Sequence, residues 1–266
     1  MTKITQKPDG TVSFEMVIPK ETIAKEYEHA LGEVVKTASI KGFRPGKAPA
    51  KMVEAQTDRS RLLSHVLDHV LSPAYSEVIH EHKLVPLIDP HVNPKSMEDG
   101  KDWVMDVTVA IAPTIDLGDF EKYVPAGLKK FKPKKDAKPE EIKDEKLNTI
   151  FDLLLDNAKI EVAPVLVDEE TRSALERLAK QLSSLKLSIE DYAKSIKKST
   201  DDLVNEYKKS AVSNLRLEFI LQKLIELKKP EVSEAEIAEL KPQKGQEPYA
   251  KYVIQKRKVL DILAAL

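Results

Sequence analysis

The spacing of apolar residues in this chain indicates both strands and helices up to about residue 112, and only helices after residue 140. Apolar and polar residues alternate over residues 12–18 and 102–111, as they do in half-buried strands. Beyond residue 140 the apolar residues keep helical spacing only. Between residues 119 and 244 the only glycine is Gly127, which leaves no place for a turn-rich β fold. The sequence therefore predicts an α+β domain followed by an all-α domain.

The first predicted domain spans residues 1–112 and mixes strands with helices. Period-two patterning predicts three strands, at residues 12–18, 84–92 and 102–111. Helical spacing predicts three helices, at residues 21–35, 51–56 and 62–79. A Lys-Pro-Asp-Gly turn before the first strand indicates an opening hairpin, and Pro73 should kink or interrupt the last helix. We expect a small antiparallel sheet with helices on one face.

A linker is expected over residues 113–139, between the two domains. This segment holds four prolines, and its second half is rich in lysine. Like charges repel and prolines extend the backbone, so the composition favours a semi-rigid spacer. A lysine tail that binds nucleic acid is the alternative, but the acidic residues that follow at 140–145 favour a solvated linker.

The second predicted domain, residues 140–266, consists of helices with marked starts. Three serines precede an acidic residue by three positions, the spacing of a capping box: Ser188 with Asp191, Ser199 with Asp202, and Ser233 with Glu236. The longest helix should span residues 201–227, and a final helix should run from 248 to 266. Such helical hairpins either close into a bundle or stand open as arms, and periodicity leaves both arrangements open.

The composition excludes several kinds of chemistry. The chain has no cysteine, so it forms neither a disulfide nor a thiolate metal site. It also lacks the glycine-rich loops that bind ATP or dinucleotides, so no cofactor is expected. No stretch resembles a secretory signal or the ~20 apolar residues of a membrane span. We expect a cytoplasmic protein with no membrane partner.

Histidines offer one enzymatic alternative. All six lie in the first predicted domain, and His65 and His69 are four residues apart on one helix, with Asp68 beside them. This is a metal-ligand spacing, and a metal-dependent enzyme would use it. However, Val66 stands where the zinc-protease motif His-Glu-x-x-His has its glutamate. Two partly exposed helix histidines are the favoured interpretation, with no metal site and no catalytic residue.

A stiff cationic loop lies between the first two helices. It reads Gly-Phe-Arg-Pro-Gly-Lys-Ala-Pro over residues 42–49. Its glycines permit positive φ, whereas its prolines fix φ and remove amide donors. From Val34 to Val53 every charged residue is a lysine or arginine, although the formal net charge of the chain is only -1. The loop is therefore expected to bind a negatively charged surface.

The loop matches Gly-Phe-Arg-x-Gly-Lys-x-Pro, the ribosome-docking signature of the trigger factor family, at all six specified positions. Segments 162–170, 187–192 and 230–237 also resemble the substrate-binding domain of that family in order and spacing. The resemblance covers most of the chain and leaves the linker and the final helix unmatched. It implies a ribosome-binding site made of Gly42, Phe43, Arg44, Pro45, Gly46, Lys47 and Pro49.

The same resemblance implies a function and partners. The loop would dock on the large ribosomal subunit beside the nascent-chain exit, touching a ribosomal protein and ribosomal RNA. The helical domain would hold nascent or unfolded polypeptides without ATP, and a weak homodimer is a further expectation. The apolar residues expected to contact clients are Leu217, Phe219, Val259, Ile262 and Leu263. The alternative role for these five residues is the core of a closed bundle.

One departure from the family pattern concerns catalysis. Most trigger factors carry a peptidyl-prolyl isomerase domain of the FK506-binding type between these two parts. Here the region between them has neither the glycines nor the strand pattern of such a domain. The expectation is a protein without isomerase activity and not an enzyme. The alternative function is an assembly chaperone or scaffold that binds folded protein partners away from the ribosome.

Overall fold

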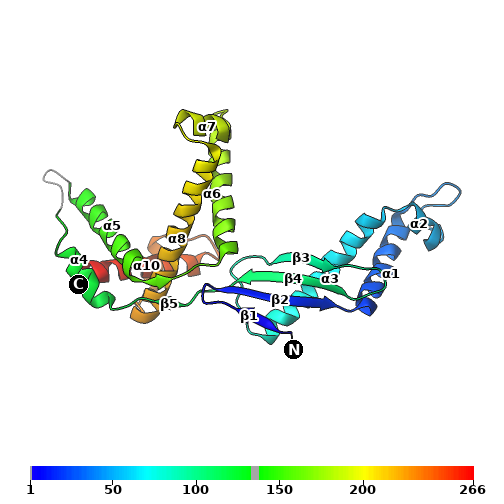
Figure 1. Cartoon of the computed structure of the whole chain (residues 1–266), viewed down its shortest axis with the longest axis horizontal. Coiled ribbons are helices and arrows are strands. Elements are labelled where there is room, and N and C mark those ends of the chain that lie inside the picture. The colour runs from blue at the N-terminus through cyan, green and yellow to red at the C-terminus, as the bar shows by residue number, and fades with distance from the viewer. Residues whose placement is uncertain (1, 133–137) are drawn as a thin grey trace. The chain divides into compact units, whose positions relative to one another are not determined.

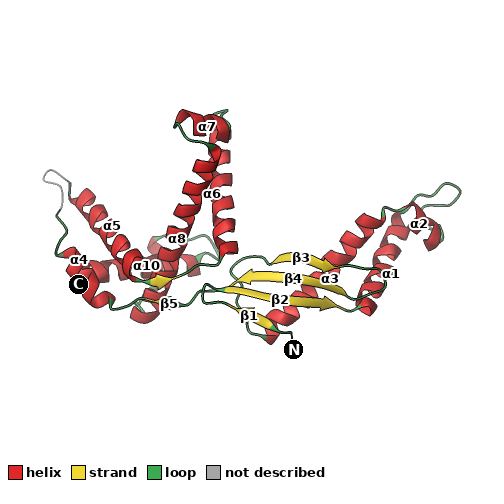
Figure 2. Cartoon of the chain, in the orientation of Figure 1, coloured by secondary structure: helices red, strands yellow, loops and turns green. Residues whose placement is uncertain are grey.

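The structure, a computed structural model, describes residues 2–132 and 138–266 (Figure 1). The chain divides into two compact units. The first contains most of residues 1–111, and the second contains Ala112–Leu266 together with the short turn Pro8–Gly10. Figure 2 shows that the first unit combines strands with helices and that helices dominate the second. The predicted order, an α+β part followed by a mainly helical part, is confirmed.

A four-stranded antiparallel sheet forms the first unit. Its strands are β1 (Ile4–Gln6), β2 (Thr11–Ile18), β3 (His91–Ser96) and β4 (Trp103–Ala110), in the order β1-β2-β4-β3. The predicted hairpin joins β1 to β2, and Gly10 supplies the positive φ of its turn. The central pair β2 and β4 runs in register from Thr11 opposite Ala110 to Ile18 opposite Trp103.

The strand predicted at residues 84–92 is wrong in position. Strand β3 begins at His91, and the preceding residues 84–90 form no strand. Pro86 and Pro90 interrupt this segment, and each removes an amide that a sheet would use. Pro94 is tolerated inside β3 because β3 is an edge strand with a register shift between Pro94 and Ser96.

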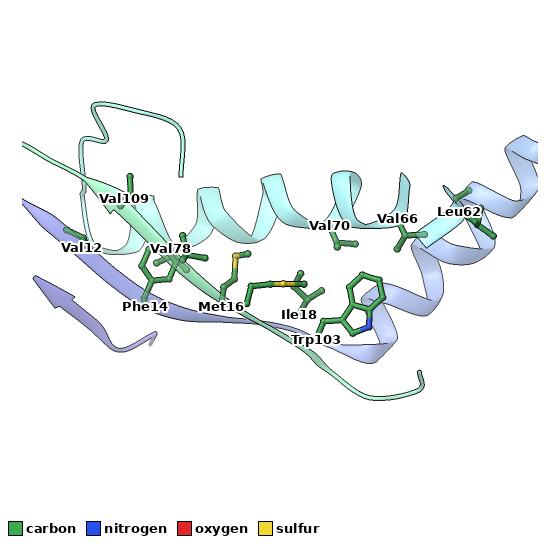
Figure 3. Packing of buried hydrophobic residues seen from close by; sticks show 13 residues of the cluster. Val12, Phe14, Met16, Ile18, Leu62, Val66, Val70, Val78, Trp103 and Val109 are labelled. Atoms are coloured by element: carbon green, nitrogen blue, oxygen red, sulfur yellow. The ribbon is translucent and has the colours of Figure 1, made fainter. Parts of the chain in front are cut away.

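Three helices complete the first unit: α1 (Lys20–Thr37), α2 (Ala50–Gln56) and α3 (Arg59–Glu81). Figure 3 shows side chains of β2 and β4, among them Phe14, Met16 and Trp103, pointing toward α3. Helix α3 continues through Pro73 without interruption, contrary to one of the two expected outcomes. Val70 and Val78 are buried on either side of the proline, so both halves of the helix are held on the sheet.

The predicted linker is wrong for most of its length. Residues 113–132 contain strand β5 (Ile115–Asp116), which pairs with β6 (Lys159–Ile160), and helix α4 (Phe120–Leu128). Helix α4 packs against α5 (Pro139–Asn157) and buries Val124 completely. Gly127 permits this contact, because a Cβ there would lie 2.4 Å from a methyl carbon of Leu153. Residues 133–137 of the predicted linker lie outside the described residues.

A helical hairpin forms one part of the second unit. It consists of α6 (Pro164–Ser184), the short α7 (Ile189–Ser195) and the first half of α8 (Thr200–Lys228). Figure 1 shows α6 and α8 side by side with α7 at their far end. A small core of Leu178, Leu182, Ala193 and Leu203 holds the three helices together. We call this hairpin the arm.

The base of the second unit is a closed bundle. The second half of α8 packs against α5 and α10 (Glu247–Ala265), and α9 (Glu234–Glu239) packs against α10. Its buried residues include Ile150, Leu154, Ile220, Leu224 and Leu263. The two arrangements that periodicity left open thus occur together, an arm on a closed base. None of the described helices has the length and apolar character needed to cross a bilayer.

Candidate functional site

The cationic loop is a pair of hydrogen-bonded turns between α1 and α2. The amide of Phe43 donates to the carbonyl of Ile40 at 3.0 Å, and the amide of Lys47 donates to the carbonyl of Arg44 at 2.9 Å. At the neck of the loop, the amide of Gly46 donates to the carbonyl of Ala38 at 3.2 Å. These hydrogen bonds restrict the backbone conformation of the residues that carry the charged side chains.

Both loop glycines adopt conformations that other residues avoid, for different reasons. Gly42 has φ +96° with open space around its Cα. Gly46 has φ +76°, and a Cβ at this position would lie 2.6 Å from the carbonyl oxygen of Lys36. The loop therefore folds back onto the last turn of α1, and only glycine permits that approach.

A small apolar cluster anchors the base of the loop. Ile40 and Ala48 are buried against Val53 of α2, and Val34 and Val35 of α1 pack on the same cluster. Pro49 immediately precedes α2 and takes its N-cap position. The base of the loop thus packs against both flanking helices, whereas residues 43–47 take no part in this apolar cluster.

The central residues of the loop face solvent. Phe43 is 39% exposed, and Arg44, Pro45 and Lys47 are exposed as well. Within the described part of the chain, no carboxylate forms an ion pair with Arg44 or Lys47. A solvent-exposed aromatic ring beside two cations without acidic partners is suited to bind an anionic surface that also has an apolar cleft.

Three of the five residues predicted to contact clients lie in the core of the base instead. Phe219, Val259 and Leu263 are buried, Leu217 is half-buried, and Ile262 is 37% exposed. The apolar stripe of α8 broadens toward its end because that half of the helix contacts both α5 and α10. A single helix period could not distinguish this broad buried face from an exposed one.

Exposed apolar residues gather instead at the end of the arm. Leu185, Leu187 and Ile196 are exposed in the connections on either side of α7. These residues were not predicted, although two leucines close before the capping Ser188 were a visible signal. Further exposed apolar residues of the second unit are Leu227, Leu240, Tyr249, Val253, Ile262 and Leu266.

A polar cluster fastens α10 to α8 within the base. The ammonium of Lys256 donates to Glu218 at 2.6 Å, and the Tyr252 hydroxyl donates to the same carboxylate. Burial alone would raise the pKa of Glu218, but the hydrogen bonds from Lys256 and Tyr252 outweigh it and leave this pKa below its usual value. Burial and the bond to Glu218 raise the pKa of Tyr252.

His65 and His69 lie near carboxylates of α1 that were not predicted as their neighbours. The rings of His65 and His69 stack with centroids 4.6 Å apart. Their carboxylate neighbours are Glu33 and Glu26 of α1, at 4.0 Å and 3.8 Å, rather than Asp68. The structure therefore does not assemble the ligand set of the enzymatic alternative.

Comparison with known proteins adds sequence relatives and a structural neighbour. The trigger factor of Staphylococcus epidermidis is 32% identical over 145 residues, which are 54% of this chain and 32% of that protein. The trigger factor of Limosilactobacillus fermentum is 37% identical over 114 residues, which are 43% of this chain and 26% of that protein. The matched part of this chain thus spans about a third or less of each relative's length.

A solved structure described as "Promiscuous Substrate Recognition in Folding and Assembly Activities of the Trigger Factor Chaperone" has a similar fold. Its TM-score is 0.69 at 14% identity, covering 100% of this chain and 99% of that chain. At this identity the likeness concerns the fold alone.

Family models cover both units. The model of the bacterial trigger factor protein matches residues 1–150, and the model of the trigger factor C-terminus matches residues 132–242. Because the two matches overlap, no isomerase domain lies between them in this chain. The first match alone includes the loop at residues 42–49 and more than half of the sequence. The chain belongs to the trigger factor family.

Proposed function

We propose that this protein is an ATP-independent chaperone of the cytoplasm that docks at the ribosomal exit and holds nascent or unfolded polypeptides. The observation that carries the proposal is the loop at residues 42–49, in which Phe43, Arg44 and Lys47 are exposed on a backbone anchored at its base. Membership of the trigger factor family supports it.

Docking follows from the chemistry of three side chains. Arg44 can donate two parallel hydrogen bonds to one phosphate or carboxylate, and Lys47 adds a compact positive charge. Phe43 can fill a shallow apolar cleft of a ribosomal protein. With two cations, the affinity for ribosomal RNA should fall with salt at a logarithmic slope of about -2 or shallower. Such binding is reversible, as an exit-site chaperone requires.

Ribosome co-sedimentation tests the docking. The variant F43A/R44A/P45A should lose binding while its circular dichroism spectrum stays unchanged. The control R257A, in an exposed part of α10, lowers the net charge by the same amount and should bind like the wild type. Retention of binding by the loop variant would refute the docking proposal. It would then favour the alternative, an assembly chaperone or scaffold that binds folded partners away from the ribosome.

Client holding is proposed for the arm rather than for the base. Leu185, Leu187 and Ile196 offer aliphatic surface at its exposed end, next to lysines that keep the surface hydrated. Many weak apolar contacts of this kind suit clients without a fixed sequence.

Suppression of aggregation of a denatured test protein, without ATP, measures this holding. The variant L185S/L187S/I196S should lose most of the protection. The control V85S/L87S/M97S removes three exposed apolar side chains from the first unit and should retain it. Equal protection by both variants would place client binding elsewhere.

Two further parts of the proposal have their own tests. A protein of this family without an isomerase domain should not catalyse prolyl isomerisation, and catalysis in a proline-specific peptide assay would contradict that. Weak self-association is proposed as well, and sedimentation velocity across a concentration series should detect a concentration-dependent dimer. A purely monomeric profile at high concentration would exclude the dimer.

A further inference from the structure

Imidazole and carboxylate groups face one another between α1 and α3 of the first unit. Glu26 and His29 are three residues apart on α1 and share one helix face, and His69 approaches from α3. The Glu26 Oε2 atom lies 3.9 Å from His29 Nδ1 and 3.8 Å from His69 Nδ1. One potential ligand atom from each residue lies within 4.8 Å of the other two.

We propose that Glu26, His29 and His69 form a binding site for a divalent transition metal ion of the zinc class. Two imidazoles and one carboxylate are a ligand set that zinc uses in proteins, and imidazole also suits copper and nickel. Zinc bond lengths of about 2.1 Å place tetrahedral ligands roughly 3.4 Å apart. The two separations from Glu26, 3.9 Å and 3.8 Å, exceed that spacing by about half an ångström, and the donor atoms of the two histidines lie within 4.8 Å of each other. Side-chain torsions of surface residues can close these gaps.

Neighbouring side chains support this geometry. When His29 presents Nδ1 to the metal, its Nε2 lies 4.0 Å from the carboxylate of Glu33. A carboxylate beside the second ring nitrogen of a ligating histidine fixes the orientation of the ring. The ring of His65 stacks on His69 and restricts that ring in turn. Glu33 and His65 are therefore positioning residues.

The charges around the site favour a cation. Among the described residues, no lysine or arginine forms an ion pair with Glu26 or Glu33. The groups within 4.0 Å of these carboxylates are the imidazoles of His29, His65 and His69, and Arg61 lines the same hollow as Glu33 without forming an ion pair with it. Two carboxylates without an ion-paired lysine or arginine supply charge for a metal ion, and the imidazole nitrogens beside them supply donor atoms.

The site is open and links two helices. The side chains of Glu26, His29 and His69 are 28%, 58% and 45% exposed, so a bound ion keeps water in its remaining positions. Because its ligands come from α1 and α3, the ion joins α1 to the helix that packs on the sheet. Helix α1 ends at Thr37, and residues 38–41 connect it to the loop. Metal binding should therefore stabilise the unit that carries the loop.

Zinc titration of the full-length, untagged, chelator-treated chain tests the site. Calorimetry should give one zinc ion per chain, with a rise in Tm on zinc addition. His69→Ala and Glu26→Gln should each weaken zinc binding at least about tenfold, and the Tm rise should shrink accordingly. Both positions are solvent-accessible, and the glutamine substitution preserves the shape of Glu26, so the apo proteins should keep the wild-type circular dichroism spectrum.

Two control histidines make the test specific. His80→Ala, at the exposed end of α3 and outside the cluster, should bind zinc like the wild type. His65→Ala should have a smaller effect than His69→Ala, because His65 positions a ligand without being one. Absence of stoichiometric zinc, one zinc per two chains, or unchanged affinity in both His69→Ala and Glu26→Gln would each overturn the proposal.

Discussion

The loop at residues 42–49 and the end of the arm both offer apolar side chains to solvent, but they are built on different backbones. The loop presents one aromatic residue between cations, on turns that depend on Gly46 and on a buried base. The arm presents several aliphatic residues around a short helix held by a small core. A fixed shape with unpaired cations suits one defined anionic partner. A surface of separate aliphatic contacts suits many partners.

The largest effect on stability is expected from a substitution in the buried core of the base. Leu263→Ala should lower the free energy of unfolding by about 2–5 kcal/mol, because Leu263 is fully buried in the base. The neighbouring change Ile262→Ala should cost only about 0.5 kcal/mol, because that side chain is partly exposed. Urea unfolding followed by circular dichroism measures both variants. An equal loss of unfolding free energy in both variants would indicate that Leu263 is not part of the core and could contact clients.

Gly46→Ala should come next and should act on the loop alone. The added methyl group would clash with the carbonyl of Lys36, and the alanine would have to keep the positive φ of Gly46. Together these effects should cost about 1–3 kcal/mol. Ribosome binding should fall sharply, because the turn that presents Lys47 has to move. Gly42→Ala, which has open space, should bind better than Gly46→Ala in the same sedimentation assay. The opposite ranking would show that the approach to Lys36 is unimportant.

Ser199→Ala should weaken the arm without affecting the loop. The Ser199 hydroxyl accepts a hydrogen bond from the amide of Asp202 at 3.0 Å and caps α8. Its loss should cost about 1 kcal/mol. Hydrogen exchange should speed up at the start of α8, while the amides of Phe43, Arg44, Gly46 and Lys47 exchange at the wild-type rate. Faster exchange in the loop would mean that the two regions are coupled.

Acid should have the smallest effect, at the start of α9. Hydrogen bonds from Lys258 and from the Ser233 backbone and hydroxyl lower the pKa of Glu236 to about 2. A lowered pKa in the folded state stabilises the protein above the ordinary value of 4.5, and this contribution disappears as the pH falls toward 2. Glu236→Gln should therefore be less stable than the wild type at pH 7 and nearly equal to it near pH 2. A constant difference across this range would contradict the assignment.

Several structural features could be predicted from local sequence. Alternation in β2 and β4 indicates their buried face, and the three serine caps mark the starts of α7, α8 and α9, because each signal acts within a few residues. The conformation at Gly42 and Gly46 follows from the same kind of local rule. The signature residues of the loop could be named because the motif is short and contiguous.

Features that depend on distant contacts could not be predicted in this way. Helix α4 contains Pro125 and Gly127, which indicate a linker until the contact of Gly127 with Leu153 is known. Phe219 and Leu263 have helical spacing whether they face a client or the core. The approach of Glu26 and His29 to His69 requires the packing of α1 on α3.

A single ribosome sedimentation series can separate docking by the loop from client holding by the arm. Ribosomes are incubated with the wild type, with F43A/R44A/P45A and with L185S/L187S/I196S at equal concentrations and low salt. If the loop docks and the arm holds clients, the arm variant should pellet with ribosomes like the wild type and the loop variant should stay in the supernatant. A loop variant that pellets like the wild type would show that residues 43–45 do not dock the protein on the ribosome.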